Sequence, residues 1–86
     1  MADVIVYSSA HCAFCERAKK FLKMKQVKFT EVRVDLDAAK REDMLERCEG
    51  RRSVPQIVIN GKAIGGFDDL KSLEEVGELD DLLAND

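Results

Sequence analysis

The sequence contains little of what marks several protein classes: among 86 residues it has no tryptophan, one proline, five glycines and three cysteines. So little glycine and proline excludes a collagen-like or low-complexity chain, and a hydrophobic share of 45% is too high for a disordered one. Apolar runs are only a few residues long, so we expect no membrane-spanning helix and no membrane partner. The length predicts a single domain over residues 1–86 with a small core.

The net charge is small, but the charges are unevenly placed. A net charge of −3 argues against a nucleic-acid partner, because nucleic-acid binding requires a basic face. From Glu16 to Lys28 there are six basic residues and one acid, whereas from Asp68 to Asp86 there are eight acids and one lysine. These segments are either solvated helix faces or, in the basic case, a rim that attracts an anionic small molecule.

Three cysteines, an odd number, do not suit a fold built on disulfides. Residues 1–7 lack both the basic and the long apolar region of a signal peptide, so we expect a cytoplasmic location. In a reducing compartment, closely spaced cysteines indicate metal binding or redox catalysis instead.

Hydrophobic patterns predict strands and helices in the order β-α-β-α-β-β-α, followed by a last short helix. The first β-α-β unit predicts parallel strands, and Asn60-Gly61 predicts a hairpin. The expected fold is α/β, a four-stranded mixed sheet flanked by helices on both faces. The strands are expected over residues 4–7, 29–34, 56–59 and 62–64. The first helix is expected over residues 13–25, and the second from a start within 35–37 to a stop at Gly50. The third is expected to be capped by Asp68 or Asp69 and to end at Gly77, with Leu70, Leu73 and Val76 facing inward. The last short helix is expected around residues 79–83.

Cys12 and Cys15 stand at the junction of a loop and the first predicted helix. The free N–H groups and positive dipole end of a helix start favour a thiolate at Cys12, and Cys15, one turn further in, can attack a mixed disulfide formed there. The competing interpretations are a metal half-site and two ordinary buried thiols. A four-ligand zinc site needs a second pair of Cys or His ligands. The only other candidates are poorly positioned, because His11 directly precedes Cys12 and Cys48 is expected in the middle of a helix. The strand–loop–helix context favours redox chemistry.

Three blocks of sequence resemble the glutaredoxin family: residues 7–15, residues 53–57 (SVPQI) and residues 65–70 (GGFDDL). They occur in the family's order and spacing, and the resemblance covers nearly the whole chain. It implies a thioredoxin fold and glutathione-dependent thiol–disulfide chemistry, with Cys12 and Cys15 as the catalytic residues.

The resemblance also implies a glutathione site. Gly66 would offer backbone N–H groups at a helix start to the γ-glutamyl carboxylate, and the Asp68 side chain would accept from the amine. A cis bond between Val54 and Pro55 would leave the Val54 backbone groups free to pair with glutathione as with an extended peptide. The expected glutathione-binding residues are Cys12, Phe14, Val54, Pro55, Gly66, Phe67 and Asp68.

The motif departs from the family's usual form at three positions. The family has Pro and Tyr between the two cysteines, where Ala13 and Phe14 stand here, and often Lys where Ser9 stands. In the family, loss of that proline tends to permit a [2Fe–2S] cluster that bridges two monomers, ligated by Cys12 and by glutathione. We otherwise expect no metal site.

Some further side chains have two interpretations. Arg51 and Arg52 either assist an anionic ligand or are simply solvated, and the resemblance makes Arg41 a candidate for the glycine carboxylate of glutathione. Tyr7 and Cys48 are expected to be buried core residues.

The predicted function is that of a glutathione-disulfide oxidoreductase that reduces protein–glutathione mixed disulfides and protein disulfides, with Cys12 as nucleophile and Cys15 as resolving thiol. Its expected partners are glutathione and glutathionylated or disulfide-containing proteins, of which ribonucleotide reductase is an example, and we expect a monomer. Two alternatives stay open. One is the cluster-bridged dimer, which the visible spectrum of protein purified without oxygen would reveal. The other is a small redoxin reduced by thioredoxin reductase without glutathione.

Overall fold

The computed structural model describes residues 2–84 of the chain. Strands and helices follow one another in the predicted order, with the short last helix as α4. The strands are β1 (Val4–Ser8), β2 (Thr30–Arg33), β3 (Gln56–Ile59) and β4 (Lys62–Gly65). The helices are α1 (Ala13–Met24), α2 (Ala38–Arg47), α3 (Phe67–Glu75) and α4 (Glu78–Ala84).

The strands form one mixed sheet in the order β2-β1-β3-β4. β1 and β2 are parallel, whereas β3 runs antiparallel to both β1 and β4. The tight turn between β3 and β4 uses Asn60 and Gly61, both with positive φ (51° and 81°), which is the backbone that a two-residue hairpin needs. The mixed sheet, the parallel pair and the hairpin expected from the sequence are therefore confirmed.

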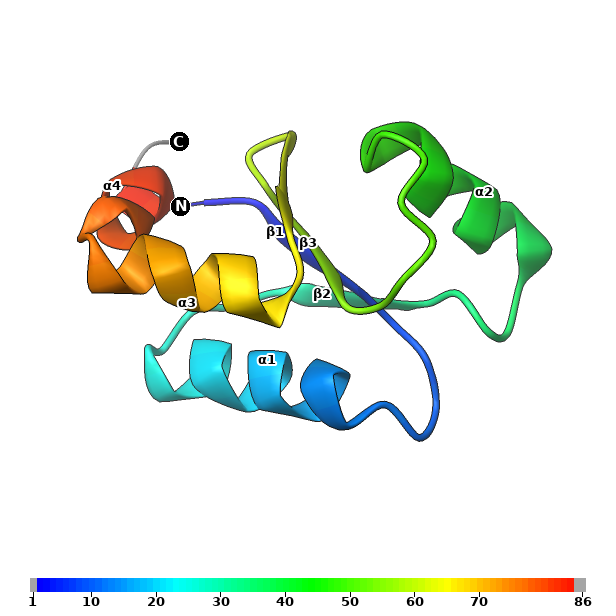
Figure 1. Ribbon diagram of the computed structural model, residues 1–86, viewed down its shortest axis with the longest axis horizontal. Coiled ribbons are helices and arrows are strands. Elements are labelled where there is room, and N and C mark those ends of the chain that lie inside the picture. Colours follow the sequence, from blue (N-terminus) through cyan, green and yellow to red (C-terminus); the bar gives the residue numbers. More distant parts are fainter. Residues whose placement is uncertain (1, 85–86) are drawn as a thin grey trace.

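Helices cover both faces of the sheet and enclose two separate cores. α1 and α3 lie side by side on one face, and α2 packs on the other (Figure 1). The core under α1, α3 and α4 contains Val4, Val6, Ala18, Leu22, Ile57, Ile59, Leu70 and Leu79. The core under α2 contains Tyr7, Val34, Met44, Cys48 and Val58. Alternate residues of β1 and β3 supply the two cores, as the twofold periodicity of a strand requires.

Helix α1 and strand β2 are both shorter than predicted. α1 stops at Met24, and Lys25 is its C-cap, with its N–H donating to the Phe21 carbonyl. β2 occupies only the middle of the predicted segment 29–34. Phe29 packs against the core under α1, whereas Val32 and Val34 face the core under α2, as the twofold alternation of a strand requires.

The predictions for α3 need two corrections. Gly66 is the N-cap, rather than Asp68 or Asp69; the Asp69 carboxylate instead accepts from the Gly66 N–H at 2.9 Å, from the third position of the helix. Val76 was expected to face inward but is 69% exposed. It is the C-cap of α3, and the chain turns away there into Gly77 (φ 78°), so its side chain leaves the buried face.

Helix α2 begins within the predicted start, with the Asp37 carboxylate accepting from the Ala39 N–H at 2.8 Å. Cys48 is the C-cap of this helix rather than a mid-helix residue, so α2 ends at Arg47, before the predicted stop at Gly50. Its thiol is fully buried beside Met44, and burial raises its pKa. A buried thiol with a raised pKa is inert, as expected for a core residue.

A network of hydrogen bonds joins helix α1 to strands β1 and β2 of the sheet. The buried Ser8 hydroxyl donates to Glu31 at 2.6 Å, and Lys19 donates to the same carboxylate at 2.8 Å. Lys19 and then Ser8 hold the pKa of Glu31 below its usual value. The ionised carboxylate therefore joins β1, β2 and α1.

Glu31→Gln is expected to lower the free energy of unfolding by about 1 kcal/mol near neutral pH, because the amide keeps an acceptor for Ser8 but loses the charge that pairs with Lys19. Since the pKa of Glu31 is lowered on folding, its contribution is present above the usual carboxyl pKa and lost as the pH falls through the lower, folded value. Urea unfolding from neutral pH to about pH 3 checks this, with exposed Glu46→Gln as control. A difference from wild type that stays constant over that range would contradict it.

Candidate active site

Cys12 is the N-cap of α1 and is joined to Cys15 by a disulfide. The Cys12 sulfur also accepts from the Cys15 N–H at 3.1 Å. Cys15 is fully buried, whereas Cys12 is half-buried. Of the two sulfurs, that of Cys12 is therefore the accessible one, and it lies where free N–H groups and the helix dipole stabilise a negative charge.

A short loop between α2 and β3 faces the Cys12 sulfur. The Val54 carbonyl oxygen lies 3.8 Å from that sulfur, and the Val54–Pro55 peptide bond is cis, as the family resemblance implied. Gln56 anchors the loop, because its Nε2 donates to the carbonyl and the hydroxyl of Ser53 at 3.0 and 3.2 Å. The Gln56 side chain is buried, so the loop is held from within the fold.

The turn between β4 and α3 approaches the same loop. A Cβ at Gly66 would lie 3.5 Å from the Pro55 carbonyl oxygen. Gly65 is buried with φ 117°, and a Cβ there would collide with the Asp69 carboxylate and lie 2.9 Å from Nη1 of Arg51. The two glycines let the backbone pass between these groups and bring the first N–H groups of α3 close to the Val54–Pro55 loop.

These three segments enclose a groove of about 220 Å³. Its lining residues are Phe14, Ser53, Val54, Pro55, Gly66, Phe67, Asp68 and Asp69. The structure thus brings together all the predicted glutathione-binding residues except Cys12, which lies beside the groove through its contact with Val54. Sequence reasoning missed Ser53 and interpreted Asp69 only as a helix cap.

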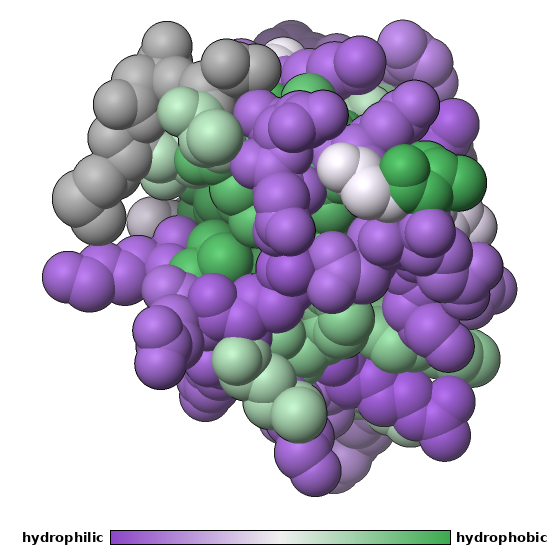
Figure 2. All heavy atoms as spheres, turned by 90° about the vertical axis from the view of Figure 1, so that its left-hand side faces the viewer, coloured by the Kyte–Doolittle hydropathy of each residue, from purple (hydrophilic) through white to green (hydrophobic). Residues whose placement is uncertain are grey.

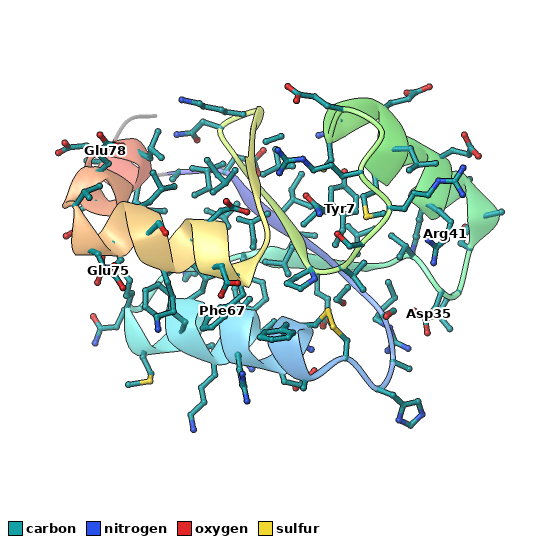
Figure 3. All side chains as sticks on the ribbon, in the orientation of Figure 1. Tyr7, Asp35, Arg41, Phe67, Glu75 and Glu78 are labelled. Carbon is teal, nitrogen blue, oxygen red and sulfur yellow. A yellow bond between two sulfur atoms is a disulfide. The ribbon has the colours of Figure 1, made fainter. Side chains whose placement is uncertain are left out.

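One wall of the groove is aromatic. The ring centroids of Phe14 and Phe67 are 6.3 Å apart, and Phe14 is 50% exposed. Phe67 also meets Phe21 edge to face at 6.4 Å, so the wall continues the packing of α3 on α1; Figure 3 shows Phe67 at the start of α3, facing α1. An exposed ring beside the accessible sulfur offers apolar contact to a bound molecule.

The loop before α1 and the strand below it are fixed by two carboxylates. Asp35 accepts from the Ala10 N–H at 3.2 Å and forms two hydrogen bonds with Arg33, which hold the pKa of Asp35 far below its usual value. Tyr7 is fully buried, and its hydroxyl donates to Asp43 at 2.7 Å. Burial, and then that bond, raise the pKa of Tyr7. Tyr7 is therefore a structural core residue, as predicted.

The remaining candidates lie outside the groove. His11, Arg41 and Arg52 are exposed and do not line it, and Arg41 is on α2, on the other side of the disulfide from Phe67 (Figure 3). Arg51 reaches the site only behind the β4–α3 turn, where its guanidinium lies against Gly65. The structure thus gives none of these three arginines a place on the groove surface.

A larger groove of about 570 Å³ lies between β4, α3 and α4, but neither Cys12 nor Cys15 lines it. Figure 2 looks onto the end of the molecule that holds α4, and apolar atoms there gather between hydrophilic ones. Without a nucleophile, this groove is not the site of thiol chemistry.

Within residues 2–84, no helix is long and apolar enough to cross a membrane. Over the same part of the chain, no three His, Cys, Asp or Glu side chains come together as a metal site. An iron–sulfur cluster would therefore need ligands from a second chain and from glutathione, so the cluster-bridged dimer stays a prediction.

Comparison with known proteins identifies the chain's relatives. The glutaredoxin family model matches residues 4–64, and over 83 residues the chain is 49% identical to glutaredoxin 3 of Escherichia coli K12, covering 96% of this chain and 99% of that protein. The chain belongs to the glutaredoxin family. The solution structure of glutaredoxin from Brucella melitensis matches with a TM-score of 0.82 at 43% identity, over 96% of this chain and 89% of that one.

A second structural match carries a ligand. The crystal structure of a buckwheat glutaredoxin–glutathione complex matches with a TM-score of 0.84 at 28% identity, over 95% of this chain and 76% of that one. These similarities confirm the thioredoxin fold and the family inferred from the three sequence blocks. Glutaredoxins are thiol–disulfide oxidoreductases that use glutathione as a co-substrate and act on glutathionylated proteins, and the Cys12–Cys15 pair has the spacing of their redox motif.

Proposed function

We propose that the protein is a glutathione-dependent reductase of protein–glutathione mixed disulfides and of protein disulfides. The observation that carries the proposal is the groove beside the Cys12 sulfur, which joins the Val54–Pro55 loop, an aromatic wall and a helix start. Because reduction by glutathione needs a reducing compartment, the proposal also places the protein in the cytoplasm.

Cys12 is the proposed nucleophile. Its thiolate attacks the glutathione sulfur of the mixed disulfide, that S–S bond breaks, and the substrate's thiolate leaves and takes a proton from water. A second glutathione thiolate then attacks the glutathione sulfur on Cys12, which yields oxidised glutathione and restores the Cys12 thiolate. Alternatively Cys15 attacks the Cys12 sulfur, releases glutathione and forms the Cys12–Cys15 disulfide, the oxidised state that the structure contains.

The backbone around the groove supports glutathione as the ligand. Within residues 2–84 the Val54 N–H donates no hydrogen bond, so it can pair with a peptide group lying along the loop. The first N–H groups of α3 suit the γ-glutamyl carboxylate, and the exposed Asp68 carboxylate suits the adjacent amine. The peptide backbone and the γ-glutamyl end of glutathione thus have complementary groups close to the Cys12 sulfur.

Trapping the adduct tests the proposal. Cys15→Ser incubated with oxidised glutathione should gain the mass of one glutathione, which reduction removes, whereas Cys12→Ser should gain none under the same conditions. Nuclear magnetic resonance of the trapped species should then show shifted amide signals around Val54, Gly66 and Asp68. Glutathione attached to Cys12 without shifts at these residues would place the ligand outside the groove.

Asp68→Ala is expected to raise the KM for glutathione by about three- to tenfold with little change in kcat, because it removes ground-state binding of the glutathione amine. Steady-state kinetics with glutathione as the varied substrate measure this. Asp81→Ala, an exposed acid on α4, is the matched control. An unchanged KM would remove Asp68 from the site.

A further inference from the structure

Four side chains form a row at the aromatic wall of the groove, in the order Arg17, Phe14, Phe67 and Lys71. The Arg17 guanidinium lies 5.1 Å from the centre of the Phe14 ring, and the Lys71 ammonium lies 5.9 Å from the centre of the Phe67 ring. The two rings are 6.3 Å apart. A cation therefore covers each outer end of the aromatic wall.

Helix geometry explains why both cations contact the rings of the aromatic wall. Side chains on a helix lean toward its N-terminus, so Arg17 meets Phe14 three residues earlier and Lys71 meets Phe67 four residues earlier. α1 and α3 both begin at the groove, with Ala13 and Phe67 as their first residues. The two cations thus lean toward the helix ends at which the groove lies.

Neither cation is neutralised by a carboxylate in the described chain. Lys71 has Asp68 and Glu75 within one helical turn but forms no ion pair with a residue among 2–84, and the same holds for Arg17. By contrast, Lys19 and Lys25 are each held by two carboxylates. In a chain with more acids than bases, two unpaired cations at the aromatic wall of the groove can accept negative groups from outside.

The groove's own two acids have other roles. Asp69 accepts from the Gly66 N–H, and Asp68 is at the helix start that we propose for the glutathione amine. The Arg17 guanidinium over the half-exposed Phe14 ring and the Lys71 ammonium over the Phe67 ring have no role in that arrangement, so they are available to the part of a substrate beyond glutathione. Such a surface fits an apolar side chain with carboxylates on either side of it.

We propose that Arg17 and Lys71 select protein substrates whose glutathionylated cysteine lies in an acidic segment, with an apolar side chain against Phe14. This inference rests on the proposed function and names its substrate class. Exposed charge pairs contribute modestly, so each cation is expected to favour an acidic over a neutral flank by about threefold. The attraction also accelerates encounter, and added salt should weaken it.

Two glutathionylated peptides that differ only in carrying Glu or Lys around the cysteine provide the test. For wild-type protein, kcat/KM should be higher for the Glu peptide, and the preference should shrink as salt is added. In Arg17→Glu/Lys71→Glu the preference should fall by about tenfold or reverse. Arg17→Gln/Lys71→Gln should move in the same direction by a smaller factor and serves if the reversed variant is unstable.

The matched control is Lys23→Glu/Lys28→Glu, which makes the same change in net charge at exposed positions away from the groove. It should keep the wild-type preference. Equal preference in the Arg17/Lys71 variants and wild type would overturn the proposal, and so would an equal shift in the control, because the effect would then be one of net charge.

A small mixed disulfide of glutathione and 2-mercaptoethanol separates the remaining outcomes. If the Arg17/Lys71 variants lose as much activity on it as on the Glu peptide, the cations act on glutathione itself and the selection of protein substrates is contradicted. If wild-type protein does not reduce this small disulfide at all, the proposed function fails, and the inference that rests on it fails with it.

Discussion

Cys12→Ser is expected to abolish reduction of glutathione mixed disulfides, with kcat/KM falling by roughly a thousandfold or more, because a serine hydroxyl is not ionised at neutral pH and cannot attack sulfur. Cys15→Ser should keep activity within about tenfold of wild type. In the wild-type protein Cys15 is fully buried, whereas the Cys12 sulfur is accessible at the helix start. A second glutathione can therefore remove the glutathione bound to Cys12 without Cys15. Steady-state assays with a small mixed disulfide measure both variants.

Cys48→Ser is the control for this pair, because Cys48 is fully buried in the core under α2 and does not line the groove. Its activity should match wild type once folding is verified by urea unfolding. Equal and complete loss in Cys12→Ser and Cys15→Ser would show that the internal disulfide is obligatory in every turnover, against the route we propose.

Gly65→Ala is expected to lower the free energy of unfolding by about 2–3 kcal/mol and to raise the KM for glutathione. With φ at 117°, alanine is strained at this position. Its Cβ would also displace the Asp69 carboxylate, which would lose its bond from the Gly66 N–H and leave the first turn of α3 uncapped. One methyl group would thus disturb both the stability of the fold and one wall of the groove.

Gly61→Ala separates these effects. Gly61 also has a positive φ, 81°, but a Cβ there would meet nothing within 4 Å. It should cost about 1–2 kcal/mol from backbone strain and leave the KM for glutathione unchanged. If Gly65→Ala is no more destabilising than Gly61→Ala and binds glutathione normally, the β4–α3 turn does not have the role assigned to it.

Local chemistry made much of this fold predictable from the sequence. A two-residue hairpin turn needs positive φ at both positions, which Asn60 and Gly61 adopt readily, so the hairpin followed from two adjacent residues. The hydrophobic periodicity after residue 13 predicts a helix there, and Cys12 and Cys15, three residues apart, therefore fall at its start. These features depend on neighbours in sequence, and the structure confirms their placement.

The features that were missed depend on contacts across the fold or on where a helix begins. Asp68 and Asp69 are adjacent acids, and because α3 begins at Phe67 with Gly66 as its N-cap, it is Asp69 that accepts from the Gly66 N–H. An acid three residues after Gly66 was the available signal. Ser53 joins the groove because buried Gln56 holds its loop, a contact that no periodicity reveals.

The most direct test of the central claim is a coupled assay with NADPH, a small glutathione mixed disulfide and one of two electron donors. With glutathione and glutathione reductase, NADPH oxidation should rise in proportion to the protein added. With thioredoxin reductase in their place, the protein should add nothing to the background rate. Turnover with thioredoxin reductase and none with glutathione would contradict the account and favour a redoxin that works without glutathione.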